Sequence, residues 1–136
     1  MAGSRRMTAG GDANASQWAK YLAEAGLTIT SGLAIDVDGA AHRGALQGLP
    51  AAGKTIAVMA TGIEQVYPYH HRQLAEQILQ ADGALITEFA PGSKPLPAYF
   101  PQRNLIISGL SLGVLVVEAA VKSGSLINAR LAMEQD

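Results

Sequence analysis

Hydrophobic positions along the chain follow two patterns that alternate. Short continuous apolar runs, typical of strands buried on both faces of a sheet, are separated by segments in which apolar residues recur every three or four positions, as on one face of a helix. The runs predict strands at residues 27–30, 55–60, 83–87 and 114–117. The periodic segments predict helices at residues 13–25, 38–46, 71–79, 103–110 and 125–135.

This alternation predicts the fold class. Parallel neighbouring strands need a crossover connection, usually a helix, whereas antiparallel strands can be joined by a tight turn. We therefore expect an α/β three-layer sandwich, with a mostly parallel sheet covered by helices on both faces. The helical spacing also predicts which side chains are buried. In the first helix we expect Trp18 in the core with Leu22, and in the 71–79 helix we expect Leu74, Ile78 and Leu79 to face inward.

Composition limits the possible functions. The 136 residues suffice for one domain, and we treat 1–136 as a single one. The net charge of −1 produces no general attraction for nucleic acid, so any such binding needs a local basic cluster. The absence of cysteine excludes disulfides and thiolate metal sites. The side chains of the neighbours His70 and His71 point in different directions, so they are poorly placed to chelate a metal ion. We expect no metal and no cofactor.

The sequence shows no membrane or secretion signal. The longest apolar run, residues 113–121, contains Glu118 and is too short to span a bilayer. The basic residues near the start are followed by no hydrophobic run of the kind that a secretory signal needs. We expect a cytoplasmic protein with no membrane partner.

Three of the predicted strands end in small polar residues. These pairs are Ser31-Gly32, Thr61-Gly62 and Thr87-Glu88. In a parallel sheet the carboxyl ends of the strands meet at one edge, where ligands collect. Helices that begin there present unpaired N–H groups, which suit phosphate. The edge is therefore a candidate anion-binding site.

Ordered sequence blocks then suggest a family. From residue 3 to the C-terminus the chain resembles the Rossmann-like domain of the DNA-processing protein A family (DprA, also called Smf). The blocks are Gly3-Ser4-Arg5-Arg6, Ser31-Gly32-Leu33-Ala34 with Asp38 to Leu46, Thr55 to Val58 with Thr61-Gly62 and Tyr67-Pro68, Thr87-Glu88-Phe89 with Pro91-Gly92, Phe100-Pro101-Gln102-Arg103-Asn104 with Ser108-Gly109-Leu110-Ser111, and Ser123-Gly124-Ser125-Leu126.

The resemblance implies a function. Members of the family bind single-stranded DNA, protect it after uptake in natural transformation, and help to load a RecA-type recombinase onto it. They act as homodimers and are not known as enzymes, so we expect no catalytic residues. The resemblance and the strand-end pattern together give these candidate DNA- or phosphate-binding residues: Gly3, Ser4, Arg5, Arg6, Gly32, His42, Thr61, Gly62, Lys94, Phe100, Arg103, Asn104 and Ser125.

Each candidate has a structural alternative. Phe100 could stack on a base or fill the core, and Arg103 could bind phosphate or cap a carbonyl group. His42 could face the groove or form a surface ion pair with Asp38 one helical turn earlier. Ser125 could contact phosphate or cap the last helix.

The chain also departs from the family pattern. Leu105 replaces a usual arginine, Asp36 a usual glycine, and Asn128 a common threonine. The family domain has a strand before Gly3 and another after residue 135, and we expect this chain to lack both. The loss of a central first strand predicts a gap between the strands at 27–30 and 83–87, and weaker DNA binding than that of a full member.

Other classes of function fit less well. A nucleoside-monophosphate hydrolase of the lysine-decarboxylase-like Rossmann group is the main alternative, but its Pro-Gly-Gly-x-Gly-Thr loop is missing here: Pro91-Gly92 continues as Ser93-Lys94. A dehydrogenase would need Gly-x-Gly-x-x-Gly after the first strand, which is also missing. A third possibility is a dimerisation domain without a ligand.

Overall fold

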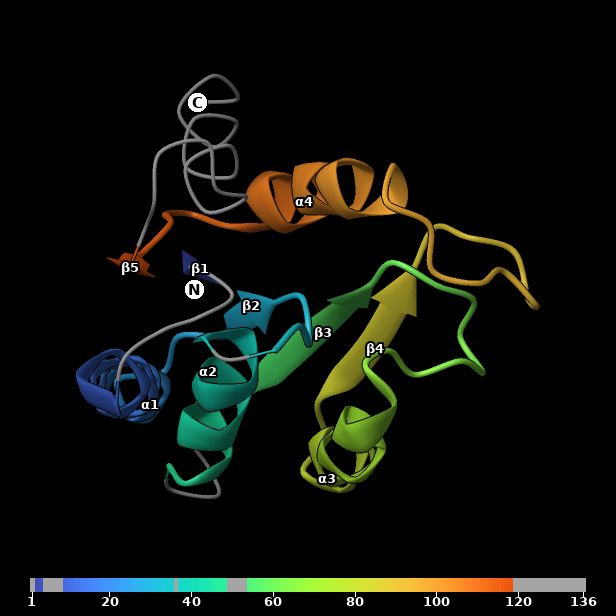
Figure 1. Ribbon diagram of the computed structural model, residues 1–136. Coiled ribbons are helices and arrows are strands. Elements are labelled where there is room, and N and C mark those ends of the chain that lie inside the picture. The colour runs from blue at the N-terminus through green and yellow to red at the C-terminus, as the bar shows by residue number, and fades with distance from the viewer. Residues whose placement is uncertain (1, 4–8, 36, 49–53, 119–136) are drawn as a thin grey trace.

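A computed structural model describes residues 2–3, 9–35, 37–48 and 54–118 (Figure 1). The predicted helix at 125–135 lies outside these ranges. Five strands are found: β1 (Ala2–Gly3), β2 (Ile29–Ser31), β3 (Thr55–Met59), β4 (Ala84–Thr87) and β5 (Val116–Glu118). The helices are α1 (Ala9–Glu24), α2 (Val37–Leu46), α3 (Arg72–Gln80), which a short 3-10 helix η1 (Tyr69–His71) precedes, and α4 (Tyr99–Leu110).

Strand β3 occupies the middle of a three-stranded parallel sheet with the order β2-β3-β4. Ile29 of β2 pairs with Thr55, and Met59 pairs with Thr87 of β4. All three strands run in one direction, so their carboxyl ends share one edge of the sheet. The predicted gap between the strands at 27–30 and 83–87 is wrong, because the apolar run at 55–59 fills that place and pairs with both.

A second pair of strands lies beyond β2 (Figure 1). Strand β1 runs parallel to β5, with Ala2 opposite Val116. We expected no strand before Gly3, yet Ala2 and Gly3 themselves form this short strand. Strand β5 was predicted at 114–117 and is found at Val116–Glu118.

Helices cover both faces of the sheet, which confirms the predicted three-layer α/β fold. Helices α1, α2 and α3 lie side by side on one face, and α4 crosses the other (Figure 1). Helix α4 contacts β2 and β3, while α2 and α3 contact β3 from the opposite side. None of the helices in the described ranges is long and apolar enough to cross a membrane.

The buried face of α1 differs from the prediction. The fully buried positions are Ala15, Ala19 and Ala23, spaced by one helical turn, whereas Trp18 is 51% exposed. The reason is the close approach of α1 to α2: a side chain at Gly44 would overlap the backbone of Ser16. Only small residues fit this contact, so the large aromatic ring is placed on the outer surface.

Helix α3 follows its prediction more closely. Leu74 and Ile78 are buried as predicted, and they pack with Leu33, Ala57 and Ala75 in one apolar cluster under the sheet. Leu79 was predicted to face inward but is 52% exposed. It lies one residue after Ile78, which turns it about 100° away from the buried face.

Helix α4 begins four residues before its predicted start at Arg103. It starts at Tyr99 and includes Pro101 in its first turn. Proline is tolerated there because the first N–H groups of a helix have no intrahelical partner. The earlier start puts Phe100 and Arg103 on one rigid element.

Candidate functional site

The turn that follows β2 is the centre of the strand-end region. The Asp38 carboxylate accepts hydrogen bonds from the N–H groups of Gly32 and Ala34, at 3.2 and 3.3 Å from Oδ2. Asp38 thereby holds the turn from the first turn of α2. It does not form the surface ion pair with His42 that the sequence offered as one alternative.

Two histidines fix Leu33 between Gly32 and Ala34. Leu33 has a φ of 59°, in the left-handed region that bulky residues avoid. Its N–H donates to Nε2 of His42 at 3.2 Å, and its carbonyl oxygen accepts from Nδ1 of His71 at 2.8 Å. Both backbone groups of this residue are therefore satisfied inside the protein.

These contacts assign the proton on His42. Because Nε2 accepts a hydrogen bond, Nδ1 carries the proton and donates it to Oγ1 of Thr55 at 2.8 Å, while Thr55 donates to the carbonyl of Ile29. Burial lowers the pKa of His42 to about 3, an effect that the Asp38 charge partly opposes. His42 is therefore neutral near pH 7, fully buried and unavailable to a ligand.

Arg103 connects α4 to the ends of two strands. Its Nη1 donates to the carbonyl oxygens of Gly32 at 2.6 Å and Val58 at 3.0 Å, and its Nε donates to Oδ1 of Asn104. The side chain is 5% exposed. Burial lowers its pKa, with Asp38 opposing the shift. The structure thus shows the carbonyl-capping alternative for Arg103.

Gly32 is required by this arrangement. A Cβ atom at Gly32 would overlap the guanidinium of Arg103 and approach Oδ2 of Asp38 at 2.9 Å. The turn is thus packed between a cation and an anion from two different helices. Gly32 is itself buried, so its role is to let the turn at the carboxyl edge of the sheet pack closely.

Thr61 and Gly62 also have a structural role at the carboxyl edge of the sheet. The Thr61 hydroxyl donates to the carbonyl of Gln65, and its own carbonyl accepts from Oγ1 of Thr87 at 2.6 Å. The Gly62 N–H donates to the carbonyl of Ser93 at 2.9 Å. Both residues are buried, and they hold the loop that carries Lys94 against the end of β3.

Three predicted site residues are open to solvent at this edge. Lys94 is exposed, and Phe100 and Asn104 are half-buried. The guanidinium carbon of Arg103 lies 5.6 Å from the centre of the Phe100 ring. Asn104 uses its oxygen on Arg103, which leaves its amide NH2 group without a partner in the described part of the chain. These side chains can reach a ligand.

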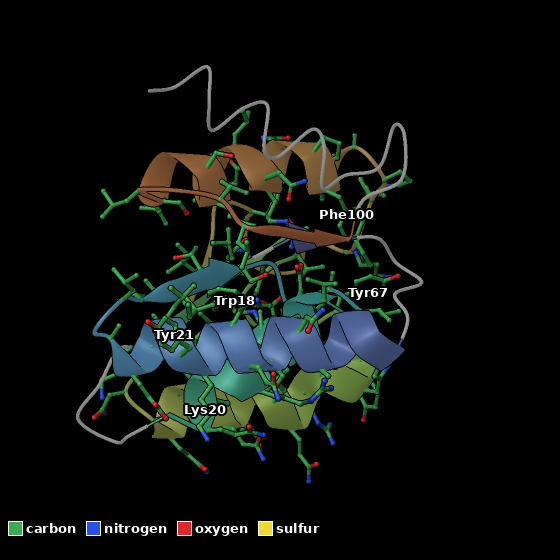
Figure 2. The ribbon with its side chains drawn as sticks, turned by 90° about the vertical axis from the view of Figure 1, so that its left-hand side faces the viewer. Trp18, Lys20, Tyr21, Tyr67 and Phe100 are labelled. Atoms are coloured by element: carbon green, nitrogen blue, oxygen red, sulfur yellow. The ribbon has the colours of Figure 1, made fainter. Side chains whose placement is uncertain are left out.

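Tyr67 is a member of this surface that the sequence did not assign to the site. Its ring is 47% exposed and lies 5.9 Å from that of Phe100. Figure 2 shows the two side chains at the same end of the molecule. The block Tyr67-Pro68 did mark the position, but no spacing rule links it to a ring 33 residues later.

Asp38 and His71 were also missed as parts of the site. Both act through backbone groups of the 31–34 turn, and a sequence pattern does not reveal such contacts. Of the remaining candidates, Gly3 lies in β1, while Ser4, Arg5, Arg6 and Ser125 lie outside the described residues. Within those residues, no group of three or more His, Asp or Glu side chains could hold a metal ion.

The chain is similar to proteins of known families. The family profile of DNA recombination-mediator protein A matches residues 1–136. Protein Smf of Escherichia coli is 49% identical over 98% of the chain, and DNA processing protein DprA of Streptococcus pneumoniae is 48% identical over 80%. The chain covers 35% and 37% of the lengths of these two relatives.

Two solved structures share the fold. The X-ray structure of DNA processing protein A from Streptococcus pneumoniae matches 98% of the chain and 46% of its own, with a TM-score of 0.85 and 42% identity. A structure of DNA processing protein A from Helicobacter pylori, described by its single-stranded DNA binding mode, matches 98% of the chain and 59% of its own, with a TM-score of 0.86 and 30% identity. The chain therefore belongs to the DNA recombination-mediator protein A family.

Proposed function

We propose that this chain binds single-stranded DNA at the carboxyl edge of its sheet and acts in DNA processing during natural transformation. Its further roles would be those of the family: a homodimer in the cytoplasm that loads a RecA-type recombinase and has no enzymatic turnover. The likeness to the Helicobacter pylori protein, described as binding single-stranded DNA, is the observation that carries the proposal. The exposed side chains at the edge give it a physical basis.

Stacking is the first part of that basis. Base stacking on an aromatic ring contributes about 1–3 kcal/mol per base and depends little on sequence. The half-buried Phe100 and the exposed Tyr67 form a ring pair, and Arg103 approaches Phe100 closely enough for a cation–π contact. Such a pair favours unpaired bases, because the bases of a duplex are already stacked on one another.

Charge is the second part. Lys94 can reach a phosphate from its exposed loop, and the amide NH2 group of Asn104, which has no partner among the described residues, can donate to a phosphate or a base. The buried polar groups position the loops that carry these side chains. They are Arg103, His42, Thr61 and Gly62. The Gly3-Ser4-Arg5-Arg6 loop and Ser125 remain proposed phosphate contacts.

The proposal is tested by fluorescence polarisation with labelled oligo-dT. We expect Phe100→Leu and Lys94→Gln each to weaken binding, and Lys94→Gln to reduce the salt slope by about 0.7, the value for one phosphate contact on a single strand. Lys20→Gln on the exposed surface of α1 is the matched control for a lost charge (Figure 2). Equal binding by the parent, Phe100→Leu and Lys94→Gln would refute this site.

A further inference from the structure

A second basic and aromatic surface lies where η1 leads into α3. Its members, which we call the η1 surface, are Arg43 on α2 together with Tyr69, His70 and Arg72. All four are exposed, and Tyr69 is 69% exposed. None of them belongs to the site described above.

Short contacts join these side chains into one patch. The guanidinium carbon of Arg72 lies 4.8 Å from the centre of the Tyr69 ring. Nη2 of Arg43 lies 3.5 Å from Nε2 of His71, and the His70 and His71 rings are 4.8 Å apart. The 69–72 segment therefore has one arginine over the exposed Tyr69 ring and a second, from α2, beside His71.

The patch carries positive charge. In the described part of the chain, neither Arg43 nor Arg72 forms an ion pair; Arg43 contacts a histidine nitrogen and Arg72 a tyrosine ring. Burial lowers the pKa of His71, the hydrogen bond to the Leu33 carbonyl opposes this shift, and the charges of Arg43 and His70 lower the pKa further. The Asp38 carboxylate accepts a hydrogen bond from the N–H group of Gly32 in the 31–34 turn and forms no ion pair with either arginine.

Glu76 is the other carboxylate to consider. It is exposed on α3 one turn after Arg72. A solvent-exposed ion pair at that spacing contributes little to stability, so it leaves Arg72 available to another anion.

The η1 surface adjoins the proposed DNA site. His71 donates from Nδ1 to the carbonyl of Leu33 at 2.8 Å, which ties η1 to the 31–34 turn. Tyr67, whose ring lies 5.9 Å from that of Phe100, precedes Tyr69 by two residues. The Phe100–Tyr67 pair and the η1 surface are therefore joined by one short stretch of chain, residues 67–69.

We propose that the η1 surface is a second contact region for the same single strand, with Arg43 and Arg72 on phosphates and Tyr69 stacked on one base. This rests on the proposed function and extends it to the path of the DNA. Nucleic acid fits better than an acidic peptide, because a strand offers alternating phosphates and flat rings, and the surface offers cations beside an exposed ring. A strand that binds only at the Phe100–Tyr67 pair would not contact the η1 surface.

The test compares oligo-dT of about 6 and about 15 nucleotides, which lie near the two ends of the range of about 4–16 nucleotides that single-strand sites occupy. In the 136-residue chain, we expect the double variant Arg43→Gln/Arg72→Gln to bind the short strand normally and the long strand about tenfold more weakly. Its salt slope on the long strand should fall by about 1.4, the value for two contacts. Lys20→Gln should change neither, because Lys20 belongs to α1, which lies on the far side of α2 from α3 (Figure 1).

Tyr69 provides the second arm. Tyr69→Phe should keep long-strand affinity and Tyr69→Leu should reduce it. Long-strand binding that is unchanged in both the double arginine variant and Tyr69→Leu overturns the inference while leaving the proposed function intact. The inference is also overturned if a Glu-rich peptide binds at the η1 surface while the double arginine variant and Tyr69→Leu bind the long DNA strand as the parent does. A parent chain that binds neither strand overturns both.

Discussion

Acidification should destabilise this protein through His42. The folded state keeps the imidazole neutral, because it is fully buried and its Nε2 accepts the Leu33 N–H. Its folded-state pKa is about 3, against an ordinary value of 6.5. Between these two pH values, the imidazole of the unfolded chain binds a proton and that of the folded chain does not. The stability present above pH 6.5 is therefore lost as the pH falls toward 3.

The magnitude follows from this difference. Between about pH 7 and about pH 5, the unfolded state gains about 2 kcal/mol from protonating this one side chain. That is a large share of the roughly 5–15 kcal/mol by which domains are usually stable. His71, whose pKa is also lowered by burial, adds in the same direction.

Urea unfolding at both pH values measures the effect. In His42→Gln, the glutamine oxygen can still accept the Leu33 N–H but has no proton to gain, so the loss between the two pH values should shrink by about 2 kcal/mol. Equal acid sensitivity in the parent and His42→Gln would refute the reasoning.

Four other predictions concern the turn, α1 and activity. Gly32→Ala should cost about 2–4 kcal/mol in urea unfolding because its methyl group meets Arg103, whereas Gly113→Ala, which meets nothing within 4 Å, should be nearly neutral. Thr55→Val should cost about 1–3 kcal/mol by removing partners of His42 and Ile29, and a neutral result would argue against that network. Trp18, the single tryptophan, should be readily quenched by acrylamide, and a shielded, blue-shifted emission would contradict its exposure. Incubation with nucleoside monophosphates should release no free base by chromatography, and release would favour the hydrolase alternative.

The sequence predicted the elements well because short apolar runs alternate with segments of helical spacing. The run at residues 55–59 was recognised as a strand, but its place between β2 and β4 was not, since pairing depends on which runs meet in space. The start of α4 was missed because Pro101 looked like a loop residue. Trp18 was misplaced because helical spacing gives a periodic pattern but does not show which neighbour packs closely; here small alanines face α2.

The site was harder to predict than the fold. Gly32, Arg103 and His42 stood out as residue types typical of phosphate binding, and the structure instead uses them to build a turn. A buried arginine and an exposed one look alike in a sequence. What decides between them is contact with carbonyl oxygens 71 and 45 residues away, which only the folded chain brings within reach.

The central claim is that the carboxyl edge of the sheet holds single-stranded DNA. A titration of the isotope-labelled chain with unlabelled oligo-dT, followed by amide NMR, tests it directly. The account predicts shifts at Lys94, Phe100 and Asn104, with the amides of Trp18 and Tyr21 on α1 unchanged. Shifts confined to α1, or none at saturating DNA, would contradict it.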